Sequence, residues 1–77
     1  MFNYKIFVEV LKDEESMAYT AYGIVVCSVE NNEGKEVLRI SDVSSDKSRV
    51  EELVDLCNKE QLEPIHIYDV IEDCLYS

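Results

Sequence analysis

The sequence contains few residues that bend or interrupt the backbone. Of its 77 residues only two are glycine and one is proline, and tryptophan is absent. Together with a hydrophobic content of 47%, this composition excludes a disordered tail and predicts a folded core. No apolar run approaches the length that spans a bilayer, and no basic start followed by an apolar stretch indicates an export signal. We therefore expect one small domain over residues 1–77, with no membrane contact.

Basic residues are also scarce. Lysine and arginine number 7 against 17 aspartates and glutamates, which gives a net charge of −10. The cations are scattered along the chain, so the mean field repels phosphate backbones and anionic lipids. Nucleic acid and membrane surfaces are therefore excluded as partners. A protein partner or a second copy of the chain remains.

The cysteines are few, odd in number and far apart. Cys27, Cys57 and Cys74 form neither a disulfide framework nor a C-x-x-C zinc knuckle. We expect reduced thiols in a cytoplasmic protein, with all three cysteines serving as small hydrophobic side chains.

The two glycines are too widely separated to form a phosphate-binding loop, and no serine nucleophile elbow is present. We therefore expect no cofactor and no enzymatic activity. Gly23 lies inside a predicted strand, which indicates a bulge or a close aromatic neighbour such as Tyr22 or Tyr4. Gly34 closes a polar cluster, from Asn31 to Gly34, that predicts a hairpin turn, and Gly34 can take a positive φ there.

Three segments rich in β-branched and aromatic residues predict strands: Tyr4 to Leu11, Tyr19 to Val29, and Glu36 to Val43. The short loops between them imply an antiparallel meander with the second strand in the middle.

The apolar period then changes to that of a helix. The first predicted helix has Ser45 or Asp46 as its N-cap, or else a capping box from Ser48 to Glu51. Pro64 suits the first turn of the second helix. The two apolar stripes are Val50, Leu53, Val54 and Cys57 in the first helix and Ile67, Val70, Ile71 and Cys74 in the second. The chain is thus predicted to be an α+β domain of order β-β-β-α-α, with both helices on one sheet face.

Both faces of the predicted sheet carry apolar side chains, which leaves one face without cover if the helices share the other. A partner would then cover it, and the alternative is that the helices straddle the sheet. Alternation places Tyr4 and Tyr22 on one face. It places Phe7, Leu11 and Val25 on the other. Which face the helices cover stays open, so all five are candidate partner-binding residues.

One polar group could carry chemistry. His66 is the only histidine, and Asp69 and Asp73 follow it at helical spacing. Such a group could orient an imidazole or hold part of a divalent metal site. An exposed histidine followed by acids is more often a solvated helix face, so we predict no metal site.

Three segments carry a family resemblance. They are Tyr19 to Ile24 (YTAYGI), Ile40 to Ser44 (ISDVS), and Pro64 to Asp73 (PIHIYDVIED). The chain resembles an uncharacterised family of small acidic proteins, a domain of unknown function found mainly in anaerobic Gram-positive spore-forming bacteria. The resemblance implies a bacterial cytosolic protein and no particular substrate.

Two functions from different classes follow from the residues. The first is a non-catalytic interaction or regulatory module that self-associates or binds a protein through its apolar sheet face. The second is an acidic inhibitor that occupies the basic site of a nucleic-acid-binding protein and presents six acids: Glu51, Glu52, Asp55, Asp69, Glu72 and Asp73.

Overall fold

A computed structural model describes residues 1–75 and contains three strands followed by two helices. The elements are β1 (Phe2–Lys12), β2 (Ala18–Glu30), β3 (Glu33–Ser44), α1 (Lys47–Glu60), the short 3-10 helix η1 (Pro64–His66) and α2 (Ile67–Leu75). The predicted α+β class and element order are confirmed. Neither helix in this part of the chain is long and apolar enough to cross a membrane.

The strands form one antiparallel sheet in the order β1-β2-β3. β1 pairs with β2 in an unbroken register from Phe2 opposite Ser28 to Lys12 opposite Ala18. The pairing of β2 with β3 is interrupted twice, and the longer interruption accompanies a left-handed Asp42 with φ of 53°. β3 is therefore the irregular edge of the sheet and β1 the regular one.

The β2–β3 hairpin turns on two asparagines. Asn31 and Asn32 have φ values of 53° and 66°, as a type I′ turn requires at both central positions. Asparagine tolerates this left-handed region better than most residues do. The positive φ that Gly34 could have supplied is taken by the asparagines, since Gly34 lies within β3 and no glycine among residues 1–75 has a positive φ.

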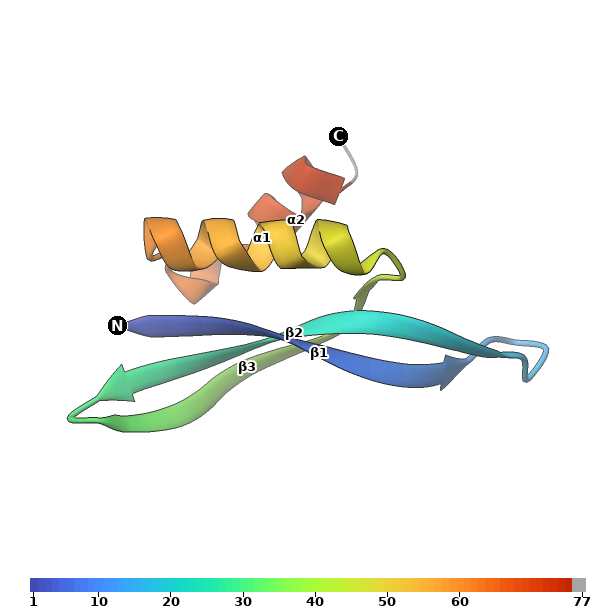
Figure 1. Ribbon diagram of the computed structural model, residues 1–77, viewed down its shortest axis with the longest axis horizontal. Helices are drawn as coiled ribbons and strands as arrows, with labels where there is room; N and C mark the ends of the chain where they lie inside the picture. Colours follow the sequence, from blue (N-terminus) through green and yellow to red (C-terminus); the bar gives the residue numbers. More distant parts are fainter. Residues whose placement is uncertain (76–77) are drawn as a thin grey trace.

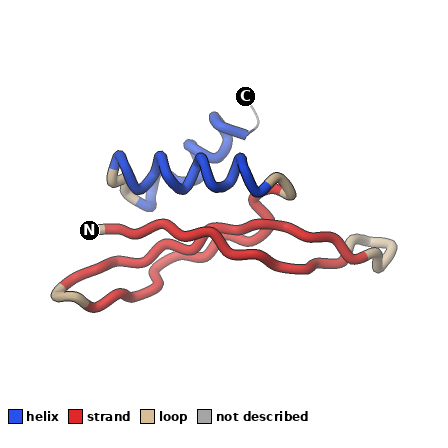
Figure 2. Tube along the Cα trace, in the orientation of Figure 1, coloured by secondary structure: helices blue, strands red, loops and turns tan. Residues whose placement is uncertain are grey.

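Both helices lie on the same side of the sheet (Figure 1), which confirms the predicted one-sided arrangement. α1 runs along the sheet, whereas α2 lies behind α1 and its C-terminal end rises away from the strands (Figures 1 and 2). Of the three predicted N-cap residues of α1, the structure has Asp46, whose carboxylate accepts from the backbone N–H of Ser48 at 3.1 Å.

The core fills the space between the sheet and the helices. The Tyr4 hydroxyl donates to the Leu62 carbonyl oxygen at 2.6 Å, so its ring can be buried without an unpaired polar group. The buried cluster comprises Tyr4, Ile24, Val26, Val43, Val50, Leu53, Val54, Cys57, Ile67 and Ile71. The face of the sheet that bears Tyr4 and Ile24 is therefore the covered face.

Two side-chain amides of the α1 end hold the N-terminal half of β1. The Asn58 Nδ2 donates to the Tyr4 carbonyl at 2.9 Å, and the Tyr4 N–H donates to Asn58 Oδ1 at 2.7 Å. Gln61 repeats this arrangement on Phe2, with both contacts at 3.4 Å. Asn58 and Gln61 thus occupy the outer edge of β1 as a neighbouring strand would.

We predict that Asn58→Ala destabilises the fold by about 1–3 kcal/mol, because it leaves the part-buried N–H and carbonyl of Tyr4 without partners. Urea unfolding monitored by circular dichroism measures this change. Lys59→Ala, at the next and exposed position of α1, is the matched control and should change stability by no more than about 0.5 kcal/mol. Equal effects of the two substitutions would contradict a structural role for the Asn58 amide.

Candidate functional site

The face of the sheet opposite the helices has no second layer over it among residues 1–75, and we call it the open face. Strand alternation and the pairing register assign its side chains. They include Lys5, Phe7, Glu9 and Leu11 from β1, Tyr19, Ala21, Gly23, Val25 and Cys27 from β2, and Arg39 from β3.

Phe7 lies across Gly23 at the centre of the open face. A Cβ at Gly23 would lie 2.5 Å from the Phe7 Cζ and 2.5 Å from the Ile40 carbonyl oxygen, so no larger residue fits there. The Arg39 guanidinium carbon lies 4.7 Å from the centroid of the Phe7 ring, in cation–π range. The aromatic neighbour that the sequence predicted for Gly23 is therefore present, but it is Phe7 and not Tyr22 or Tyr4.

Arg39 is held over the ring by Glu36. The two side chains form an ion pair of 2.7 Å, which raises the pKa of Arg39 and lowers that of Glu36 through the hydrogen bond between them. Both groups are exposed, so the pair orients the guanidinium more than it stabilises the fold.

Glu9 reaches across β2 to the irregular part of β3. Its Oε2 accepts from the Ser41 hydroxyl at 2.7 Å and from the Asp42 N–H at 2.8 Å. Ala21, the ladder partner of Glu9, is fully buried even though it lies outside the main core cluster. The Tyr19 hydroxyl donates to Asp42 at 2.9 Å, and this hydrogen bond raises the pKa of Tyr19. The polar groups at this end of the open face therefore bond to one another.

The structure separates the five predicted partner-binding residues. Phe7, Leu11 and Val25 are half-buried on the open face. Tyr4 is only 1% exposed, so its proposed place on a binding surface is corrected: α1 and the segment after it cover this half of β1. Tyr22 is half-buried and packs against the edge of the same core.

His66, Asp69 and Asp73 do not come together as a ligand set. Within residues 1–75 no three histidine, cysteine or acidic side chains are close enough to hold a metal ion. His66 ends η1, whereas Asp69 and Asp73 lie on α2, and all three residues are exposed. The helical spacing seen in the sequence is interrupted, because the chain changes from 3-10 to α geometry after His66.

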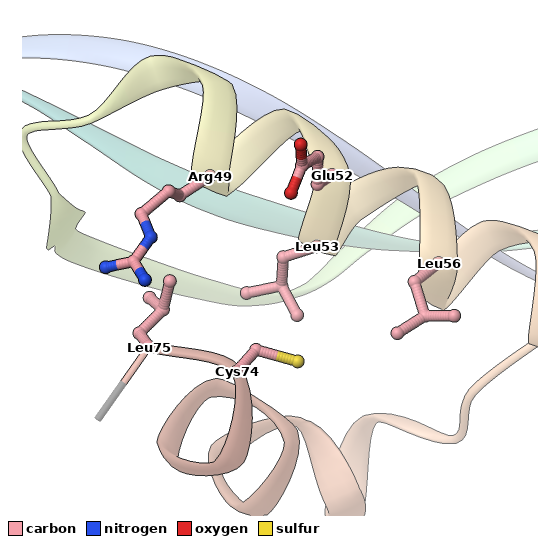
Figure 3. A pocket seen from close by; sticks show the side chains of 6 residues that line it. All are labelled: Arg49, Glu52, Leu53, Leu56, Cys74 and Leu75. Carbon is pink, nitrogen blue, oxygen red and sulfur yellow. The ribbon is translucent and has the colours of Figure 1, made fainter. Parts of the chain in front are cut away.

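Cys57 is buried against the sheet, and burial raises the pKa of its thiol to about 11. The predicted burial of Cys74 is wrong. This residue is exposed because the C-terminal end of α2 rises away from the sheet. Cys74 instead faces a cavity of about 280 Å³ between α1 and α2 (Figure 3). Figure 3 shows Arg49, Glu52, Leu53, Leu56 and Leu75 around the same space.

Nothing in the sequence pattern alone singles out Glu9, Arg39, Asn58 or Gln61 as residues that shape the exposed parts of the sheet. The alternation of side chains along the third strand predicts that Arg39 lies on the face opposite Leu38 and Ile40. Its position over Phe7 depends on the β2–β3 register, which the sequence does not specify.

We predict that stability falls as the pH rises above about 9, since burial raises the pKa of Cys57 from 9.0 to about 11 and that of Tyr4 from 10.0 to about 12. The folded chain then binds more protons than the unfolded chain, so the stabilisation is complete below the unfolded values and is lost above them. Urea midpoints measured up to about pH 11 test this. In Cys57→Ala the loss should begin nearer pH 10, because the remaining groups with a raised pKa are Tyr4 and the exposed Tyr19. A flat profile in the parent chain would contradict the burial of both groups.

Comparison with known proteins adds a family and no activity. No curated protein and no solved structure matches the chain. A family model described as "Family of unknown function (DUF6514)" matches residues 1–77. The match covers the whole sheet and both helices, so the chain belongs to the DUF6514 family of unknown function.

Proposed function

We propose that the chain is a non-catalytic interaction or regulatory module that binds a protein partner through the open face. The observation that carries this proposal is the one-sided cover of the sheet. Both helices lie over the Tyr4 side, and Phe7, Leu11 and Val25 have no second layer over them. Apolar and aromatic surfaces of this kind are typical of protein interfaces.

The fixed arrangement of the open face supports the proposal. Phe7 is held against Gly23 and under Arg39, and the carboxylate of Glu9 is held by Ser41. A rigid surface loses little side-chain entropy when a partner binds. An apolar centre with charged groups already paired around it therefore suits a protein better than a small ligand.

A catalytic role has little support in the described residues. The buried Cys57 thiol has a raised pKa, which opposes thiolate formation. His66 is exposed at the end of η1, and no group of metal-binding side chains adjoins it within residues 1–75. We therefore propose that the module acts by binding alone.

The helices favour a second candidate function, the acidic inhibitor of a nucleic-acid-binding protein. Their outward side chains include six exposed acids: Glu51, Glu52, Asp55, Asp69, Glu72 and Asp73. These acids lie on the helices, on the side of the sheet away from the open face. A basic partner held by them would dissociate in salt, whereas a partner on the open face would not.

We also propose a cytoplasmic location, which the three free thiols support. The bacterial origin implied by the resemblance stays a prediction.

We predict that a partner retained by the tagged chain in about 1 M salt, where screening is nearly complete, is lost when Val25 is replaced by Asp. The carboxylate would lose its water in the interface, and its cross-strand neighbours Lys5 and Arg39 offset only part of that cost. Quantitative mass spectrometry of the retained proteins measures the loss, which should exceed about tenfold for a cost of 1.4 kcal/mol or more.

Thr20→Asp is the matched control, because Thr20 lies on β2 but its exposed side chain belongs to the opposite face. It should retain the partner, and circular dichroism should show both variants folded. Equal retention by Val25→Asp and the parent chain would contradict the open-face proposal. Loss of every partner in salt would favour the acidic surface instead.

A further inference from the structure

The outer edge of β1 is closed along one half and open along the other. Asn58 and Gln61 bond to the backbone of Tyr4 and Phe2, which closes the N-terminal half. Beyond Tyr4 the edge continues through Ile6, Val8 and Val10, and Figure 1 shows that this half of β1 extends past the start of α1.

The open half presents unpaired backbone groups. In an antiparallel pair, alternate residues direct both N–H and C=O toward the same neighbour. Since Phe2 and Tyr4 direct theirs away from β2, the even-numbered residues Ile6, Val8 and Val10 do so too. No hydrogen bond to these outward groups occurs within residues 1–75. The segment is a template for one more strand.

The side chains of the open half suit strand pairing. Val8 and Val10 are 64% and 70% exposed, although they are β-branched and lie in a regular strand. The opposite edge of the sheet differs, because β3 has two register shifts and several charged residues: Glu33, Lys35, Glu36, Arg39 and Asp42. Such features protect an edge from pairing. The open half of β1 has an unbroken register, and between Ile6 and Val10 its one charged residue is Glu9.

We propose that the β1 edge from Ile6 to Val10 pairs antiparallel with the same segment of a second copy of this chain, about a two-fold axis at Val8. Each Val8 then lies opposite its counterpart, and each Ile6 lies opposite Val10 of the other copy. The two sheets join into one of six strands, with the helices of both copies on the same side. The exposed Val8 and Val10 side chains pack together across the axis.

The backbone hydrogen bonds and the charged side chains of β1 favour the register centred on Val8. They also favour a second copy of this chain as the added strand. Centring the axis on Val8 pairs Ile6, Val8 and Val10 with one another and leaves Tyr4 bonded to Asn58, with Lys12 at the end of β1 outside the pairing. Moving the axis to Phe7 would bring Val10 opposite Tyr4, whose outward groups are occupied. Moving it to Glu9 would place two carboxylates opposite each other. The Val8 register instead sets each Lys5 diagonally across from Glu9 of the other copy.

This dimer leaves the open face exposed, so it stands whether or not a partner binds there. It also doubles that face, because the two copies of Phe7, Leu11 and Val25 lie on the same side of the joined sheet.

The test uses Val8→Pro in sedimentation velocity across a concentration series. Proline at this position removes an N–H that faces outward and has no partner within the chain, and edge strands tolerate proline there. The parent chain should sediment as a dimer that dissociates on dilution. Val8→Pro should remain a monomer at concentrations more than about tenfold above the parent midpoint. Val8→Thr keeps the branched shape and the N–H, and should dimerise within about threefold of the parent.

A second variant keeps the proposal testable if Val8→Pro fails to fold. Val8→Lys places two like charges opposite each other at the axis, so it should weaken the dimer by more than about tenfold at low salt and less at high salt. A parent chain that stays monomeric throughout would overturn the proposal. So would a dimer that persists in both variants. A dimer that is lost in Phe7→Asp but kept in Val8→Lys would show face-to-face association instead and would equally overturn it.

Discussion

The paired hydrogen bonds between the Asn58 amide and the backbone of Tyr4 set the arrangement of the whole domain. They join positions 54 residues apart in the sequence and fix the C-terminal end of α1 against the edge of β1. With α1 placed there, the Tyr4 ring is buried, and Leu62 receives its hydroxyl. The remaining chain supplies only η1 and α2, which pack on the same side. One face and half of one edge are closed, and the rest of the sheet is left exposed.

The exposed parts of the sheet differ in kind. The open face is a fixed surface, since Phe7 rests on Gly23 and contacts Arg39, and Glu9 is bonded to the irregular segment of β3. The open edge consists of backbone groups and two exposed valines. A face of this type offers buried apolar area to a partner, whereas an edge offers directional hydrogen bonds and a defined register. The two surfaces can therefore serve different contacts at the same time.

Much of the fold follows from residue order, and its failures have local causes. Alternation predicted three strands and correctly grouped Phe7 with Leu11 and Val25, because side chains in a strand alternate regardless of what packs on them. It could not choose the covered face, since both faces are apolar and the choice depends on contacts of Asn58 and Leu62 with Tyr4. The apolar stripe of α2 that predicted a buried Cys74 is present, but α2 diverges from the sheet before Cys74, which is therefore exposed.

Residue-resolved amide hydrogen exchange on a dilute sample tests the central account most directly. The Tyr4 amide should exchange slowly, at the rate of core amides such as Ile24, because its N–H donates a hydrogen bond to Asn58 Oδ1. The Ile6 and Val8 amides should exchange more than about tenfold faster. In Asn58→Ala the Tyr4 amide should become as fast as Ile6 while the β1–β2 ladder stays protected. Equally slow exchange at Tyr4, Ile6 and Val8 in the dilute chain would contradict an edge that α1 closes over one half only.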